Sequence, residues 1–141
     1  MKHQNEIYSQ CLYFTSNTLS RIMSKMADQE FAPIGLSSSY AFLVMTVVDK
    51  PGIQPKEISK IMELTPSTVT RLIEKLEFKQ LLSRKIVGRT TEVFPTDSSI
   101  ELSPKIIEAW YKLYDKYCKI LGKEFAEELI HKVYFASQEL K

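Results

Sequence analysis

Residues 64–84 read LTPSTVTRLIEKLEFKQLLSR, and one face of the helix they predict is entirely apolar. Apolar residues recur there at the i, i+3, i+4, i+7 spacing of a helix packed against a core: Val69, Leu72, Ile73 and Leu76. Thr65 is a favourable N-cap, and Pro66 suits the first helical position because an N–H there would have no partner within the helix. The stretch predicts a helix with a polar first turn.

Two short strands are predicted directly after this helix. LLSRKIV and TTEVF are separated by Gly88-Arg89, a pair suited to a turn. Before the helix, Pro55 opens a shorter helix with an apolar inner face. A short helix, a second helix and a ribbon in this order predict a winged helix-turn-helix.

Longer amphipathic helices are predicted on both sides of this unit. One runs over about residues 4–29, and another is capped by Ser37 and ends before Pro51-Gly52. Asp97 or Ser98 caps a helix after the ribbon, Gly122 ends that helix, and a last helix follows. The outer helices are apolar over faces wider than so small a centre can cover, which favours a two-fold dimer.

The predicted fold class is mainly α, a winged helix-turn-helix with a two-stranded β wing, flanked by long N- and C-terminal dimerisation helices. A length of 141 residues is typical of one domain. We expect that domain to span residues 1–141, with the winged helix in 36–96 and the dimerisation helices in 1–31 and 97–141.

The polar face of the helix at 64–84 has the chemistry of a DNA-reading surface. With the apolar stripe inward, the outward residues are Ser67, Thr68, Thr70, Arg71 and Lys75. A helix N-terminus with short hydroxyl side chains approaches a polyanion closely, and its N–H groups favour phosphate. Arg71 is long enough to reach a guanine edge in the major groove, or a phosphate beside it.

The ribbon predicts a second DNA contact. Arg89 at the turn is suited to a narrow minor groove, and Arg84 and Lys85 are suited to flanking phosphates. Residues 55–92 contain eight basic and five acidic residues, so they carry more than the whole chain's net charge of +2. The same features also fit an ordinary capped helix and a solvated face, and some winged helices bind only proteins. A winged-helix protein-interaction module, or a degenerate regulator without strong DNA binding, is therefore the alternative function.

Residues 35–84 resemble the central region of MarR-family transcriptional regulators. The resemblance is carried by Leu36-Ser37, Pro51-Gly52, Glu57-Ile58, Ser67-Thr68-Val69-Thr70-Arg71-Leu72, Leu76-Glu77 and Leu81-Leu82-Ser83-Arg84. It implies a homodimer with interlocked terminal helices, a pseudo-palindromic double-stranded operator, and regulation by a small ligand or by oxidation. We expect the protein to be a repressor that such a signal releases. It also implies that Pro66, Ser67, Thr68, Thr70, Arg71 and Arg89 lie at the DNA. We expect Thr65, at the start of the same helix, to lie there as well.

The chain departs from the family pattern in and around the wing. Val87 stands where the family carries an aspartate that holds the wing together, and Gln80 replaces a glycine. These departures concern the rigidity of the wing and leave the recognition helix unchanged.

Two sensing modes are open at the sequence level. Cys11 lies near Tyr8 and Tyr13, and organic-hydroperoxide-sensing members of the family use a cysteine at a similar position, although a lone cysteine on an apolar helical face also suits a core. The other mode is a small aromatic or lipophilic effector in a cleft lined by aromatic residues, which equally suit a core: Tyr8, Phe14, Phe42, Trp110, Tyr111 and Tyr114.

Other functional classes have little support in the sequence. No nucleophile–base pair or glycine-rich phosphate loop can be assembled, so we expect no enzyme. Cys11 and Cys118 are far apart and no metal-ligand cluster is present, so we expect no metal or cofactor. No apolar run approaches the roughly 18 residues of a membrane span, and the first ten residues are polar, so we expect a cytoplasmic protein without membrane contact.

Overall fold

The computed structural model describes residues 4–141, so residues 1–3 of the predicted N-terminal arm lie outside it. The elements follow in the order α1 (Gln4–Tyr8), α2 (Leu12–Phe31), η1 (Ala32–Ile34), α3 (Ser38–Asp49), α4 (Pro55–Met62), α5 (Pro66–Phe78), β1 (Leu82–Val87), β2 (Thr90–Pro95), α6 (Asp97–Leu121) and α7 (Lys123–Glu139). The predicted fold class, a mainly α winged helix-turn-helix with a two-stranded wing and long flanking helices, is confirmed.

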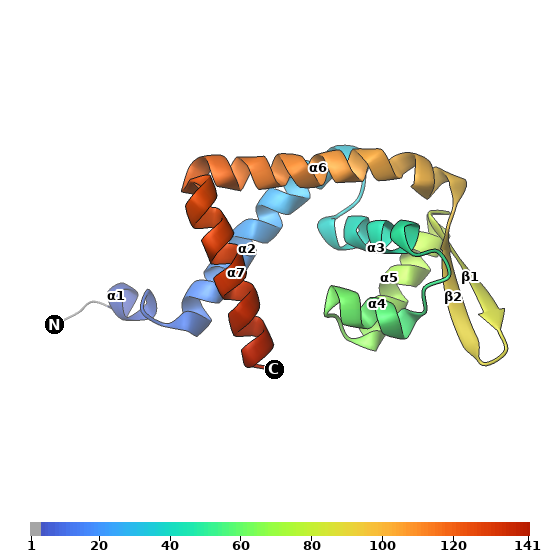
Figure 1. Ribbon diagram of the computed structural model, residues 1–141, viewed down its shortest axis with the longest axis horizontal. Coiled ribbons are helices and arrows are strands. Elements are labelled where there is room, and N and C mark those ends of the chain that lie inside the picture. Colours follow the sequence, from blue (N-terminus) through green and yellow to red (C-terminus); the bar gives the residue numbers. More distant parts are fainter. Residues whose placement is uncertain (1–3) are drawn as a thin grey trace.

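The core lies where α3, α4, α5 and the wing meet the first half of α6 (Figure 1). The apolar stripe predicted for α5 is buried throughout, which fixes the polar face of that helix outward. The core is completed by side chains from the neighbouring elements: Leu43, Val44, Val47, Ile58, Val93 and Ile106. Burial of this stripe therefore determines which residues of α5 face solvent.

The wing is an antiparallel pair in which Leu82 lies opposite Pro95 and Val87 lies opposite Thr90. Its base is tied to the core because Ile53, in the loop after α3, forms a β-bridge with Val93. The strand nearest the core is thus anchored on both sides, while the turn projects away from the core (Figure 1).

Two helix boundaries differ from the predictions. The expected helix over residues 4–29 is broken after Tyr8, and α2 restarts at Leu12 with Cys11 in an extended conformation. The cap of α6 is Thr96, not Asp97 or Ser98, because Thr96 and Ser99 form a reciprocal capping box. Ser37 does cap α3 by position, but Asp28 accepts the hydrogen bond from the Ser38 N–H at 3.0 Å.

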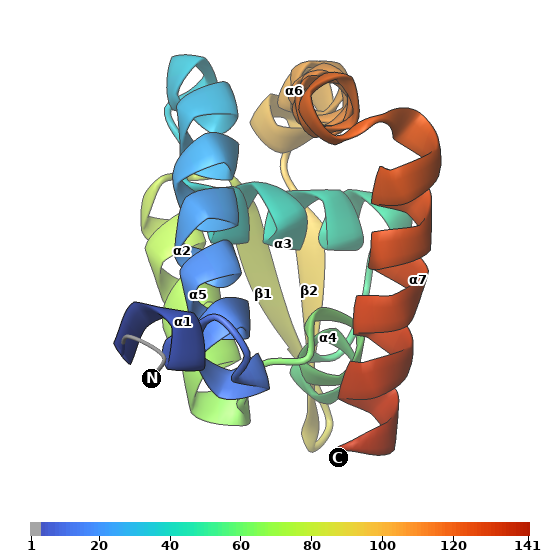
Figure 2. The same cartoon turned by 90° about the vertical axis from the view of Figure 1, so that its left-hand side faces the viewer.

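Helices α2, α6 and α7 form an arm beside the winged helix, with α6 joining the two parts (Figures 1 and 2). Ala126 is the only buried residue of α7, and large apolar side chains on that helix are exposed: Phe125, Ile130, Val133, Tyr134 and Phe135. Within residues 4–141, no single helix is long and apolar enough to cross a membrane. Residues 12–34 and α3, bent by 66° at their junction, reach that length and composition only together.

Candidate nucleic-acid interface

The start of α5 is a cluster of hydroxyl side chains. Thr65 accepts a hydrogen bond from the Thr68 N–H at 3.4 Å, and the hydroxyl oxygens of these two residues lie 2.8 Å apart. The Thr70 hydroxyl donates to the Pro66 carbonyl at 3.0 Å, which seats it against the helix. Thr65, Pro66, Ser67 and Thr70 are exposed and Thr68 is half-buried. The first turn therefore offers short polar groups and the positive end of the helix dipole to solvent.

Two cations lie on the next turns of α5. Arg71 and Lys75 are exposed, and neither forms a hydrogen bond or ion pair with any residue in the described range. Their charges are therefore available to an external anion.

The wing ends in a two-residue turn. Gly88 has φ of +63°, and no such value occurs at Arg89. The Thr90 hydroxyl closes the turn by donating to the Val87 carbonyl at 2.8 Å. Arg89 is exposed at the tip, and Lys85 is exposed along β1. The Arg89 side chain is therefore exposed on a two-residue turn that a hydrogen bond closes.

Arg84, predicted to face phosphates, forms a two-pronged ion pair within the protein. Its Nη2 lies 2.8 Å from Oε1 of Glu77 and its Nε lies 3.3 Å from Oε2. The Glu77 carboxylate raises the pKa of the Arg84 guanidinium above its usual value. The pair joins β1 to the end of α5, so it supplies a wing anchor in a chain that has Val87 in place of the family's aspartate.

A contact that the sequence did not reveal lies at the turn between α4 and α5. Glu63 accepts a hydrogen bond from Nε2 of Gln138 at 3.0 Å and pairs with Nζ of Lys141 at 2.6 Å. These partners lower the pKa of the Glu63 carboxyl. The C-terminal end of α7 is thereby attached to the turn that precedes the hydroxyl cluster.

The predicted sensing residues fall into two separate groups. Tyr8 and Phe14 stack across the α1–α2 break with ring centroids 5.3 Å apart. Cys11 lies in that break and is exposed, so the core placement considered for it is wrong in the single chain. The second group is on α6, where Trp110 and Tyr114 stack with centroids 6.3 Å apart. The structure does not join the two groups.

Trp110 and Phe42 line one hollow of about 340 Å³ between α3, α4 and α6, together with Met45, Thr46, Ile61 and Met62. Tyr114 instead donates a hydrogen bond to Glu127 at 2.8 Å, which raises the pKa of its phenol. Cys118 is half-buried beside it on α6. Only part of the predicted aromatic cluster thus faces a hollow.

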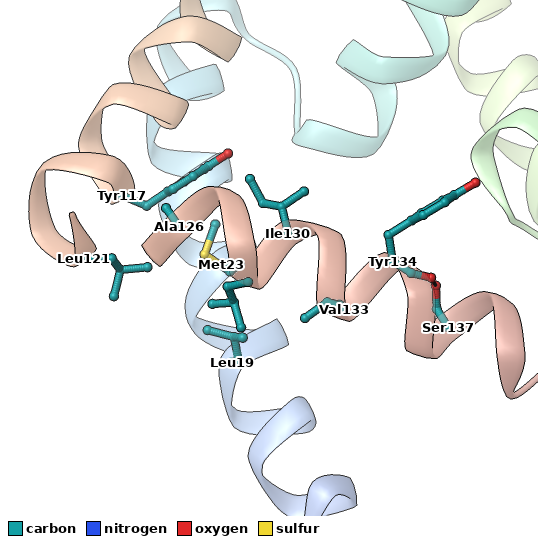
Figure 3. A pocket seen from close by; sticks show the side chains of 10 residues that line it. Leu19, Met23, Tyr117, Leu121, Ala126, Ile130, Val133, Tyr134 and Ser137 are labelled. Atoms are coloured by element: carbon teal, nitrogen blue, oxygen red, sulfur yellow. Dashed lines mark hydrogen bonds between the residues drawn. The ribbon is translucent and has the colours of Figure 1, made fainter. Parts of the chain in front are cut away.

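A second hollow of about 370 Å³ was not predicted as a site (Figure 3). Side chains from α2, α6 and α7 converge on it, and almost all are apolar: Leu19, Met23, Tyr117, Leu121, Ala126, Leu129, Ile130, Val133, Tyr134 and Ser137. In the sequence, only the apolar periodicity of the last helix hinted at this hollow. Among residues 4–141, no group of three or more His, Cys, Asp and Glu residues is arranged to hold a metal.

Comparison with known proteins identifies the winged helix. The sequence profile of the MarR family matches residues 36–86, which run from just before α3 into β1. This winged helix belongs to the MarR family. No curated protein sequence matches the chain.

Solved structures share the fold over almost the whole chain, including the helices of the arm. MepR of S. aureus in a DNA complex is 19% identical with a TM-score of 0.82, over 93% of this chain and 98% of MepR. The repressor CouR bound to a 23-mer duplex is 14% identical with a TM-score of 0.86, over 97% and 99%. A MarR protein from Peptoclostridium difficile is 22% identical with a TM-score of 0.78, over 89% and 84%. At these identities the likeness shows a shared fold.

Proposed function

We propose that this MarR-family protein is a homodimeric, sequence-specific DNA-binding transcriptional regulator, a repressor released by a small ligand or by oxidation. The observation that carries the proposal is the placement of two exposed surfaces. The α4–α5 turn, which leads into the hydroxyl cluster, and the wing turn with Arg89 lie at the same end of the molecule in both views (Figures 1 and 2). One duplex can meet both, with α5 in the major groove and the wing on the adjoining backbone or minor groove.

The proposed dimer is supported by the arm. The large apolar side chains of α2 and α7 that stay exposed in one chain include Leu12, Ile22, Val133 and Phe135, at 66%, 51%, 52% and 64%. Exposed apolar surface on this scale marks an interaction site, and a second copy of the same arm is the partner that symmetry supplies most often. Two copies place two α5 helices on one face, as a pseudo-palindromic operator requires.

Related structures contain both kinds of ligand that we propose, a DNA duplex and a small molecule. MepR and CouR are in complexes with DNA, while CouR of Rhodococcus jostii is also bound to p-coumaroyl-CoA. For this protein we propose a small aromatic or lipophilic effector, with the hollow beside Trp110 and Phe42 as its site. MarR-family proteins are transcription regulators and not enzymes, and we place this one in the cytoplasm, where operator DNA is found.

Selection of bound duplexes from a random library, combined with sedimentation of the free protein, tests the proposal. We expect a dimer and an enriched motif of two inverted half-sites whose binding weakens steeply with salt. A monomer at working concentrations, or failure to enrich any motif, would contradict it.

The alternative function, a protein-interaction module, is favoured by one observation. Ile86 and Val87, beside the wing turn, are 79% and 46% exposed, an apolar pair where a basic surface would suit DNA. No retardation of any duplex at low salt, with the dimer intact, would support this alternative.

A further inference from the structure

One exposed stripe runs the whole length of α5. Ser67, Arg71, Glu74 and Phe78 follow each other at four-, three- and four-residue steps, which places them on a single face. All four are exposed, and Phe78 at the far end is 89% exposed. The stripe continues the hydroxyl-rich start of the helix for two more turns, so it would face whatever α5 is laid against.

Glu74 is the acidic member of this stripe, and the protein does not use its carboxylate. Glu77, one turn further on, is held by Arg84 in the two-pronged ion pair. Glu74 forms no hydrogen bond or ion pair within residues 4–141 and acts on Arg84 only through space. Its neighbours around a shallow hollow of about 360 Å³ are Arg71, Lys75 and Phe78. The carboxylate is therefore exposed and ready to accept hydrogen bonds.

A carboxylate on a DNA-facing surface needs donors, because the phosphates repel it. An ionised carboxylate can only accept hydrogen bonds. In the major groove the donors are the N4 amino group of cytosine and the N6 amino group of adenine. Adenine also presents the N7 acceptor beside its amino group, which disfavours a carboxylate. Cytosine is the base whose edge suits Glu74.

We propose that Glu74 is a specificity-determining residue that accepts a hydrogen bond from the N4 amino group of a cytosine in each half-site. This inference rests on the proposed function, because it requires α5 in the major groove. Arg71 lies one turn nearer the start of α5, so the guanine suited to Arg71 and the cytosine read by Glu74 belong to the same half-site. Glu74 excludes other bases at its position and adds selectivity that the hydroxyl cluster lacks.

The test compares the full-length wild type with Glu74→Gln and Glu74→Ala in the same random-duplex selection. Binding to the selected duplex and to its single-base variants is then measured by fluorescence anisotropy. Glu101→Gln is the matched control, because it makes the same chemical change on an exposed part of α6 outside the proposed interface. Circular dichroism checks that the helix content of the variants is unchanged.

We expect the wild type to require cytosine at one position of each half-site. Glu74→Gln should change that preference to adenine, because a glutamine amide both donates to N7 and accepts from N6. Glu74→Ala should lose the preference, with about 5- to 100-fold weaker discrimination per half-site. Glu101→Gln should behave as the wild type.

Two results would overturn the proposal. One is an unchanged motif together with tighter binding of Glu74→Gln to every duplex, which is the behaviour of a carboxylate that only repels phosphate. The other is an unchanged motif with unchanged affinity. A wild type that selects no motif would instead overturn the proposed function itself, and this inference with it.

Discussion

The carboxylate of Glu63 lies 2.6 Å from the ammonium group of Lys141, so the end of α7 holds the turn that leads into α5. Glu63 has φ of +54°, a left-handed conformation that side chains other than glycine adopt at a cost. Gln138 donates to the same carboxylate. The arm and the proposed DNA-binding end of α5 are thus joined within one subunit, at a residue in a left-handed conformation.

Replacing Lys141 by methionine should lower the free energy of unfolding slightly at pH 7. Lys141 and Gln138 lower the pKa of Glu63 from its ordinary 4.5. A carboxyl group with a lowered pKa stabilises the folded state fully above its ordinary pKa, and the contribution is lost as pH falls through the folded value. The difference between wild type and Lys141→Met in urea unfolding should therefore be largest near neutral pH and disappear in acid.

Salt provides an independent check of this ion pair. Both partners are about half exposed, so 0.5 M sodium chloride should shrink the difference. Lys132→Met is the control, because it removes an exposed lysine of α7 that has no ion-pair partner among residues 4–141. A difference that survives both acid and salt would mean that Lys141 acts through packing.

Replacing Gln80 by glycine should stabilise the protein by about 0.5–1 kcal/mol, because a left-handed residue costs about 1–2 kcal/mol and glycine loses about 0.5–1 kcal/mol of backbone entropy. Gln80 has φ of +62°, and its carbonyl, which accepts from Thr96 at 2.8 Å, is kept in the variant. Urea unfolding measures the change. Lys79→Gly, at φ of −77°, should have the opposite sign.

Arg71→Ala and Arg89→Ala should weaken DNA binding in different ways. Loss of Arg71, on the face of α5, should cost about 1–3 kcal/mol on the selected sequence and relax the preference at one position per half-site. Loss of Arg89, at the wing turn, should weaken binding to all duplexes more evenly and reduce the salt slope by about 1 per subunit. Anisotropy titrations at several salt concentrations separate the two. Equal losses from Arg71→Ala on every sequence would remove Arg71 from base reading.

A carboxylate at Val133 should break the proposed dimer. Val133 lines the hollow among α2, α6 and α7 and is 52% exposed in the single chain, so the proposed dimer would bury it. A buried, unpaired charge costs about 3–5 kcal/mol. Sedimentation should show monomers, and DNA affinity should fall with them. His131→Glu adds the same group two residues earlier, outside the lining of the hollow, and should stay dimeric. A Val133→Glu dimer of unchanged stability would place the interface elsewhere.

The winged helix could be predicted because its determinants are local. The α5 stripe repeats without interruption, Thr65-Pro66 marks its start, and Gly88 marks the turn of the wing. Each signal lies within a few residues of the structure that it specifies. Which residues of α5 face outward followed from the stripe alone.

Most of the missed features have no clear marker in the local sequence. The break at Ser9-Gln10-Cys11 has no proline or glycine, and the apolar spacing runs through it unchanged. The Thr96 cap depends on Ser99 and on the Gln80 carbonyl, which lies on the other side of the wing. The attachment of Glu63 to α7 joins residues 75 positions apart in the sequence. The pairing of Arg84 with Glu77 spans only seven residues, but it depends on how β1 folds back beside the end of α5, which composition and spacing do not specify.

Helix α6 has 25 residues and is therefore a rod about 37 Å long, running from the wing to the arm. A tilt of about 5° at one end of such a rod displaces the other end by about 3 Å. One base pair occupies about 3.4 Å of the duplex axis. A tilt of this size, starting at the α6–α7 junction, is therefore enough to shift the proposed recognition helix by about one base pair relative to its half-site.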